Sequence, residues 1–362
     1  MNIFTNKTLP LRLMAAAVAA SAVSSIGVGV AAAAEPDERT RVSSGLTPVS
    51  SSGWKSTEIP FFQFAGDVAM SSDGERAFVG HWYGLDIVDT ASSKVVDTFD
   101  SVKPGSGQLA VSSDGKKLYS IQQPEYDVAA SEIAVIDPMA GTRMGDIPLG
   151  AGVRPISIAL SPDGSKLYVA TRGEGPTKIK VVNTATNEIR NIDLGNPNMP
   201  AGCDLSISPD GSRLYIHGGS EVLAVDTSSG DLHTMGTVAS ARASIKTSAD
   251  GSYVYVSGNV GDTSYGVQVI AADSGKVAAT IDTPATVSDM AMSADGKTLF
   301  ATMDNGAVLE IDTNNHSVRD TLETGGNAVR SRAGTAVTPD GNRLFVANSR
   351  LESDMVTSFA RT

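Results

Sequence analysis

The sequence predicts an all-β fold in which seven similar four-stranded sheets close into a ring, a seven-bladed β-propeller. An Asp-Gly dipeptide recurs seven times at intervals of 40–49 residues, which is the usual repeat length of propeller blades. A short strand-like run follows each dipeptide. The last repeat is incomplete, and a further strand-like run precedes the first repeat. Together these observations indicate a closed ring of blades rather than an open array.

The Asp-Gly dipeptides are predicted to be the turns between the first and second strands of each blade. Glycine adopts a positive φ without steric cost, and such turns require this conformation. A sevenfold repetition favours turns over calcium ligands. The dipeptides are Asp73-Gly74, Asp114-Gly115, Asp163-Gly164, Asp210-Gly211, Asp250-Gly251, Asp295-Gly296 and Asp340-Gly341.

The third repeat shows how four antiparallel strands fit into one blade. Apolar and polar residues alternate over residues 156–160, which predicts the first strand, and residues 166–170 follow the turn as the second. A loop leads to the third strand at 179–183. A second hairpin then gives the fourth strand at 188–194.

The ring is predicted to close through the N-terminal part of the propeller. After its turn the seventh repeat has room for only two strands, at residues 343–347 and 355–360. Residues 54–60 form an additional strand-like run. We expect this run to complete the last blade, because an open seam would leave strand edges unpaired. The propeller therefore covers residues 54–362.

The N-terminus is predicted to direct export. Lys7 and Arg12 precede an apolar, Ala-rich stretch, and small residues follow up to Ala34. This pattern is typical of a secretory signal peptide, here residues 1–34, cleaved near Ala34; an uncleaved membrane anchor is the alternative. Residues 35–53 are rich in Ser, Pro and charge, and are predicted to be a flexible lead-in. We expect a secreted or cell-envelope protein with no membrane span in its mature chain.

The charge and cysteine content narrow the classes of partner. The formal net charge is −12, and removal of Lys7 and Arg12 with the signal peptide makes it −14. Such a chain is repelled by nucleic-acid backbones and anionic lipids, which disfavours nucleic acid as a partner. Cys203 is the only cysteine, so no intramolecular disulfide can form. We expect Cys203 to be a small buried core residue and the protein to be a monomer.

Two phrases of the third repeat resemble a known family. Residues 161–170 read Ser-Pro-Asp-Gly-Ser-Lys-Leu-Tyr-Val-Ala, and residues 181–187 read Val-Val-Asn-Thr-Ala-Thr-Asn. They are similar to YVTN-type β-propeller repeats, and the resemblance covers about residues 54–362. It implies membership of the wider lactonase-like group of seven-bladed propellers, which includes surface-layer proteins, periplasmic binding proteins, lactonases and cofactor-enzyme subunits. Because the matching residues form turns and core, they specify architecture rather than function.

One face of the predicted ring is more elaborate than the other. Loops between second and third strands gather with the blade-to-blade connections on one face, called here the loop face, and the Asp-Gly turns form the opposite turn face. The loop-face loops are longest in blades two, three and five, at residues 122–131, 172–178 and 258–266. Insertions on one face of a repeat protein often mark its binding face; neutral variation in length is the alternative.

The loop face also collects the aromatic and arginine side chains expected to bind a ligand. A Trp on a short loop beside a polar mouth is a common ligand platform, although it can equally cap the packing of a blade. Arginines can hold an anionic ligand or pair with carboxylates. The predicted ligand-binding residues are Trp82, Tyr83, Tyr126, Arg154, Arg172, Arg242, Tyr265 and Arg332.

A ring of seven positions is predicted near the mouth of the central channel, six residues before each Asp-Gly aspartate. Three of these positions carry carboxylates, which are candidates to bind a divalent cation or, with His81 and His217, to act as catalytic acid and base. An ion-paired, solvated rim is the alternative. The occupants are Asp67, Gln108, Ser157, Asp204, Ser244, Asp289 and Gly334.

The sequence favours a binding module over an enzyme. It has no Gly-x-Ser-x-Gly elbow, no His-Glu-x-x-His motif and no phosphate-cradling loop. The sequence gives no evidence of a cofactor, and it leaves open whether a divalent cation binds. We therefore expect an exported module that binds a small molecule, a glycan or a protein. A lactonase-like hydrolase or lyase is the alternative, and it rests on fold analogy.

Overall fold

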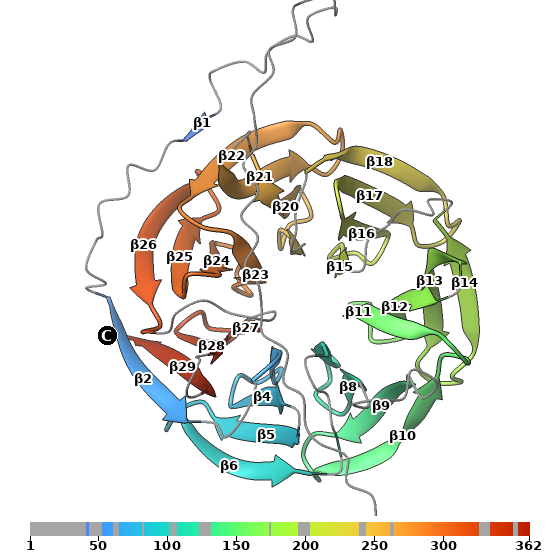
Figure 1. Ribbon diagram of the computed structural model, residues 1–362, viewed down its shortest axis with the longest axis horizontal. Coiled ribbons are helices and arrows are strands. Elements are labelled where there is room, and N and C mark those ends of the chain that lie inside the picture. Colours follow the sequence, from blue (N-terminus) through green and yellow to red (C-terminus); the bar gives the residue numbers. More distant parts are fainter. Residues whose placement is uncertain are drawn as a thin grey trace, which may run out of the picture. The chain divides into compact units, whose positions relative to one another are not determined.

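The computed structural model describes residues 41–42, 53–60, 65–81, 83–100, 102, 107–122, 132–173, 175–194, 203–238, 244–260, 264–325, 334–349 and 354–362. Within these residues the chain forms strands and turns only, arranged as seven sheets around a central axis (Figure 1). The predicted seven-bladed, all-β propeller is confirmed. None of the described residues belongs to a helix long and apolar enough to cross a bilayer.

Each blade is an antiparallel sheet. Its strands follow one another from the central channel to the outer edge of the ring (Figure 1). Blades one and two comprise β3 (Val68–Met70), β4 (Arg76–His81), β5 (Gly84–Asp89), β6 (Lys94–Phe99), β7 (Leu109–Val111), β8 (Leu118–Ile121), β9 (Glu132–Asp137) and β10 (Thr142–Pro148). Blades three and four comprise β11 (Arg154–Leu160), β12 (Lys166–Gly173), β13 (Gly175–Asn183), β14 (Ile189–Asp193), β15 (Cys203–Ile207), β16 (Arg213–Gly218), β17 (Glu221–Asp226) and β18 (Leu232–Thr237).

Blades five to seven follow the same plan. They comprise β19 (Ile245–Thr247), β20 (Tyr253–Asn259), β21 (Tyr265–Ala271), β22 (Val277–Thr283), β23 (Val287–Met292), β24 (Thr298–Met303), β25 (Ala307–Asp312), β26 (Ser317–Glu323), β27 (Thr335–Val337), β28 (Arg343–Ser349), β29 (Asp354–Arg361) and β2 (Trp54–Pro60).

The third blade differs from its prediction at the loop face. Strand β12 continues to Gly173 and β13 begins at Gly175, so most of the loop predicted at residues 172–178 is strand. The prediction failed there because glycine and charged residues give no apolar alternation.

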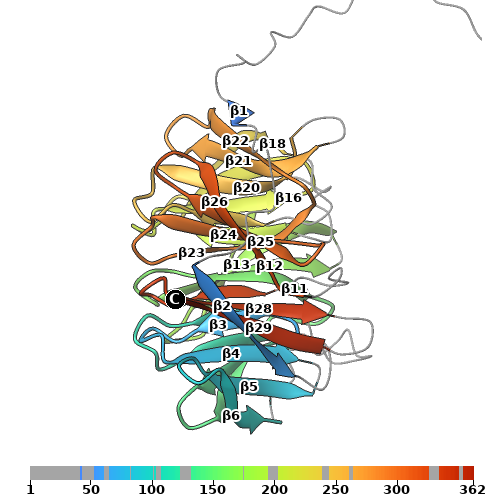
Figure 2. The same cartoon turned by 90° about the vertical axis from the view of Figure 1, so that its left-hand side faces the viewer.

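The ring closes as predicted, through the strand that precedes the first blade. Strand β2 pairs antiparallel with β29, from Trp54 opposite Arg361 to Pro60 opposite Met355, and Figure 2 shows the two strands side by side. The indole Nε1 of Trp54 also donates a hydrogen bond to Glu310 Oε2 of blade six at 2.9 Å. The closing strand is therefore tied to two blades.

A two-residue strand at Arg41–Val42, β1, adds to the outer edge of blade five. It pairs parallel with β22, with Arg41 opposite Thr280 and Val42 opposite Ile281. A strand this short has no periodicity that sequence analysis could detect. The predicted signal peptide, residues 1–34, and the remainder of the predicted lead-in up to residue 52 lie outside the described residues.

Seven apolar clusters form the core, one at each junction between adjacent blades. The second strand of every blade supplies one fully buried aromatic ring to the junction with the next blade, and burying such a ring stabilises the fold by roughly 2–3 kcal/mol. Burial also raises the pKa of the four tyrosines among these rings. The rings are Phe78, Tyr119, Tyr168, Tyr215, Tyr255, Phe300 and Phe345.

The Asp-Gly turns are confirmed. In blade three, Asp163 Oδ1 accepts hydrogen bonds from Ser161 Oγ at 2.6 Å and from the N–H of Ser165 at 3.0 Å, while Gly164 has a φ of 70°. The other six blades repeat this pattern, with Thr in place of the first Ser in blade seven. The motif shared by the repeats is thus a hydrogen-bonded turn.

Candidate functional site at the channel mouth and loop face

The side chains predicted at the channel mouth join neighbouring blades. They lie just before or within the first strand of each blade, and the first strands surround the centre of the ring (Figure 1). Asp67 Oδ2 of blade one accepts the N–H of Leu109 in blade two at 2.8 Å. Gln108 Oε1 of blade two accepts the N–H of Ile158 in blade three at 2.8 Å.

The same contact recurs at two further junctions. Asp204 Oδ2 accepts the N–H of Ile245 at 3.1 Å, and Asp289 Oδ2 accepts the N–H of Thr335 at 2.8 Å. In each case the acceptor is the mouth residue of one blade, and the donor directly follows the mouth residue of the next. These side chains therefore satisfy backbone groups that the sheets leave unpaired near the channel.

Asp204 connects its own blade, blade four, with three other blades. Its Oδ1 accepts a hydrogen bond from Gln108 Nε2 of blade two at 2.9 Å and one from Ser157 Oγ of blade three at 3.2 Å. Together with Ile245 of blade five, these donors surround a side chain that is 1% exposed. Such donors compensate the loss of hydration of a buried carboxylate.

Glycine occupies the seventh mouth position for a steric reason. A Cβ on Gly334 would lie 2.3 Å from the backbone nitrogen of Val68, closer than two nonbonded atoms can approach. The N–H of Gly334 instead donates to the carbonyl oxygen of Gly66 at 3.0 Å. At this mouth position, the backbones of blades seven and one are therefore in direct contact.

The two candidate catalytic histidines lie in different blades. His217, at the end of β16, is fully buried, and its Nε2 donates to the carbonyl oxygen of Val238 at 2.9 Å. It stands opposite Asp204 in the pairing of β15 with β16. The structure therefore brings one of the predicted histidines next to one of the predicted carboxylates, inside blade four.

His81, at the end of β4, has a separate set of partners in blade one. Its Nδ1 accepts the N–H of Tyr83 at 3.3 Å, and its Nε2 lies 3.6 Å from Asp86 Oδ2. Asp86 is buried, and its other oxygen accepts the hydroxyl of Thr98 at 2.5 Å. Nothing in the sequence marks Asp86 as a functional residue, because the residues around it have the pattern of an ordinary strand.

The divalent cation stays a prediction, because the structure does not test it. In the described part of the chain, no three His, Cys, Asp or Glu side chains are grouped closely enough to hold a metal ion. Cys203 is buried in the core between blades three and four, as expected.

Several predicted ligand-binding residues are exposed on the loop face. Tyr83 of blade one is 53% exposed and Tyr265 of blade five is 41% exposed. Arg154 and Arg172 are exposed and lie directly opposite each other on β11 and β12. Trp82, Tyr126, Arg242 and Arg332 lie outside the described residues.

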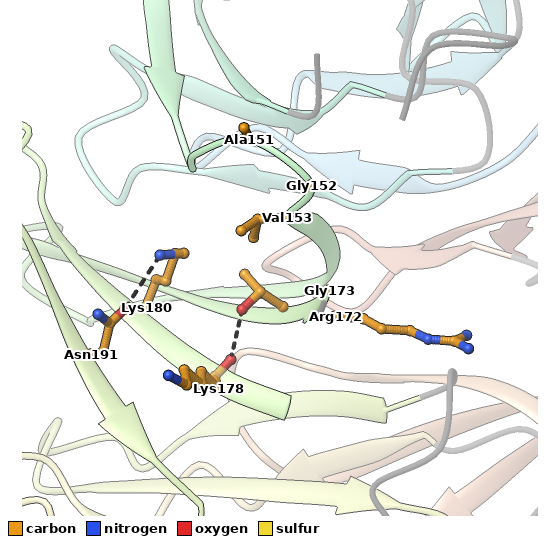
Figure 3. Close-up of a pocket in the computed structure, with 9 residues that line it drawn as sticks. Ala151, Gly152, Val153, Arg172, Gly173, Lys178, Lys180 and Asn191 are labelled. Carbon is orange, nitrogen blue, oxygen red and sulfur yellow. Dashed lines mark hydrogen bonds between the residues drawn. The ribbon is translucent and has the colours of Figure 1, made fainter. Parts of the chain in front are cut away.

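A pocket of about 450 Å³ opens on blade three (Figure 3). Of the predicted residues, Arg172 lines it. Its two lysines could not be predicted from the sequence, because alternating charged residues in a strand are also typical of a solvated sheet face. The pocket is lined by Ala151, Gly152, Val153, Thr171, Arg172, Gly173, Lys178, Lys180 and Asn191.

Comparison with known proteins identifies the fold and no more. The chain is similar to a solved structure described as Kuenenia stuttgartiensis hydrazine synthase, with a TM-score of 0.68 and 22% sequence identity, over 83% of this chain and 96% of that one. In all, 1726 chains of solved structures are similar to it, so the fold does not select a function. No model of a protein family and no curated protein matches the sequence.

Proposed function

We propose that this protein is an exported YVTN-type propeller that binds a ligand or a protein through its loop face and channel mouth. The observation that carries the proposal is a contrast between two sets of side chains. The mouth carboxylates accept hydrogen bonds that hold blades together, whereas tyrosines and cationic side chains stand exposed on the surrounding face.

The exposed tyrosines support a binding role. A tyrosine presents a large, rigid apolar surface together with a hydroxyl group, and such residues are enriched at binding interfaces. Tyr83 and Tyr265 keep about half of their surface in water. Both tyrosines lie on the loop face of the ring. Repeat proteins often bind partners through one such face.

The lactonase-like alternative is favoured by one observation. The Nε2 atom of His81 lies 3.6 Å from Oδ2 of a buried carboxylate, Asp86, and a histidine beside a carboxylate is a candidate for acid–base chemistry. The burial of Asp204 and His217 weighs against their use on a substrate.

A screen separates the two functions. The purified chain would be tested by thermal shift against monosaccharides, lactones and divalent metal chlorides, with hydrolysis of each lactone followed in parallel. A binding module should show a shift without turnover. Y83A/Y265A should weaken the binding of a hit, whereas M139A, which removes a 66% exposed side chain from the turn face, should not. Lactone hydrolysis that is lost in H81A would favour the enzyme instead.

Export is the part of the proposal that rests on sequence alone. Lys7, Arg12 and the Ala-rich stretch before Glu35 support it. The mass of the protein recovered from the periplasm or medium should correspond to a chain beginning near Glu35. A full-length chain recovered with the membrane fraction would support the anchor.

A further inference from the structure

We infer that the blade-three pocket binds a small ligand that carries an oxyanion group, that is, a carboxylate, phosphate or sulfate. This inference rests on the proposed binding function and names the chemistry of one site. The whole chain has a formal charge of −12, yet the pocket lining contains Arg172, Lys178 and Lys180 and no acidic residue. A local concentration of cations in an acidic protein points to a bound anion.

Two lysines and an amide share one side of the pocket. Lys178 and Lys180 are two residues apart on β13 and therefore project from the same face of the strand. Asn191 stands opposite Lys180 on β14, and its Oδ1 accepts a hydrogen bond from Lys180 Nζ at 3.3 Å. Figure 3 shows the three side chains extending to the same side. This bond orients the ammonium group and leaves the Asn191 NH₂ as a further donor.

The cations around the pocket have no carboxylate partner in the part of the chain that the structure describes. No ion pair there involves Arg154, Arg172, Lys178 or Lys180. Asp193 is the cross-strand neighbour of Lys178, but it does not line the pocket.

The strands next to the pocket place like charges opposite each other. Arg154 and Arg172 are cross-strand neighbours on β11 and β12, an arrangement that destabilises a sheet in the absence of a counter-charge. The Arg172 side chain extends away from the two lysines (Figure 3), so the inferred contact with the oxyanion rests on Lys178, Lys180 and Asn191.

The backbone shapes the pocket. A Cβ on Gly173 would lie 2.8 Å from the carbonyl oxygen of Gly152, and Gly152 itself has a φ of +71°. The two glycines allow the connection between blades two and three to approach the end of β12 closely. The resulting volume of about 450 Å³ falls within the range of small-molecule sites and exceeds the size of a bare inorganic ion. A monosaccharide-sized acid fits these requirements.

The experiment is calorimetric titration of the full chain with sodium phosphate, sodium sulfate and sodium glucuronate at constant ionic strength, with glucose as the neutral probe. We expect saturable binding of at least one oxyanion, strongest for glucuronate if the ligand is a sugar acid. K178Q/K180Q should lower the affinity about tenfold or more, which corresponds to the loss of charge-assisted hydrogen bonds. K94Q/K276Q removes two exposed lysines from other blades and should leave the affinity unchanged.

Three results would overturn the inference: no saturable binding of any oxyanion, binding retained in K178Q/K180Q, or an equal loss in K94Q/K276Q, which would show a general charge effect. Circular dichroism and the thermal midpoint verify that both variants fold. If a neutral ligand binds through Tyr83 and Tyr265 and no oxyanion binds, the blade-three site is excluded. The proposed binding function of the loop face is then retained. Failure of both would remove the proposed function as well.

Discussion

Asp204 places one carboxylate among donors from three other blades. Gln108, Ser157 and Ile245 each direct a hydrogen bond at it, and its exposure of 1% means that water cannot replace them. A buried donor left without its acceptor costs about 1–3 kcal/mol. The residue therefore acts on stability through groups that are far from it in the sequence.

We predict that Asp204→Ala lowers the free energy of unfolding by about 3 kcal/mol, because at least two buried donors lose their acceptor. Urea denaturation followed by circular dichroism measures this change. Asp273→Ala, at an exposed turn position in blade five, should change the stability by less than about 0.5 kcal/mol. An unchanged unfolding midpoint in Asp204→Ala would contradict the proposed role.

These contacts explain which features the sequence could predict. The Asp163 turn lies within a few residues of its own partners, so its chemistry is visible in a short phrase that recurs in every blade. Asp204 and Gln108 are 96 residues apart, and nothing local marks them as partners. Spacing alone identified Asp67, Asp204 and Asp289 as equivalent positions of their blades, but it could not supply the donors with which they form hydrogen bonds. Lys178 and Lys180 were missed because strand periodicity describes any solvated face equally well.

At the scale of the element, the seven turns share one electrostatic property. The hydroxyl group of Ser161 and the N–H and hydroxyl groups of Ser165 hold the pKa of Asp163 at about 2. Asp210 is held at about 2 by the equivalent donors. The pKa values of the other five turn aspartates are also lowered, mainly by their hydrogen bonds. An unfolded aspartate titrates near pH 3.9, so folding lowers the pKa at every turn.

The sign of this shift predicts progressive acid destabilisation. A carboxylate with a lowered folded pKa stabilises the fold above its unfolded pKa, and this contribution is lost as the pH falls through the folded pKa. Urea midpoints should therefore decrease between about pH 4 and about pH 2. In Asp163→Asn/Asp210→Asn, which retains side-chain acceptors without the charge, the decrease should be smaller. A decrease as steep as that of the wild type would show that other groups govern the acid limit.

At the scale of the whole molecule, the ring depends on a strand pair formed by opposite ends of the propeller. Every residue of β2 pairs with a residue of β29, and side chains extend the closure into blade six. The guanidinium of Arg361 lies 4.3 Å from the centre of the Trp54 ring and donates to Glu310 Oε1 at 2.6 Å. Trp54 Nε1 bonds the other oxygen of Glu310, which is only 3% exposed.

Trp54 is therefore the residue whose loss should affect closure most. Trp54→Ala removes a buried ring that packs edge-to-face on Phe300 at 5.8 Å, and it leaves the carboxylate of Glu310 without one of its donors. The free energy of unfolding should fall by roughly 3–5 kcal/mol, as for other large core truncations. Lys55→Ala changes the exposed neighbour in the same strand and should have little effect. Hydrogen exchange distinguishes local from global loss: faster exchange of β29 amides than of blade-three amides in Trp54→Ala would show the ring opening at its seam. Uniform acceleration in all blades would instead show that the seam and the ring unfold as one unit.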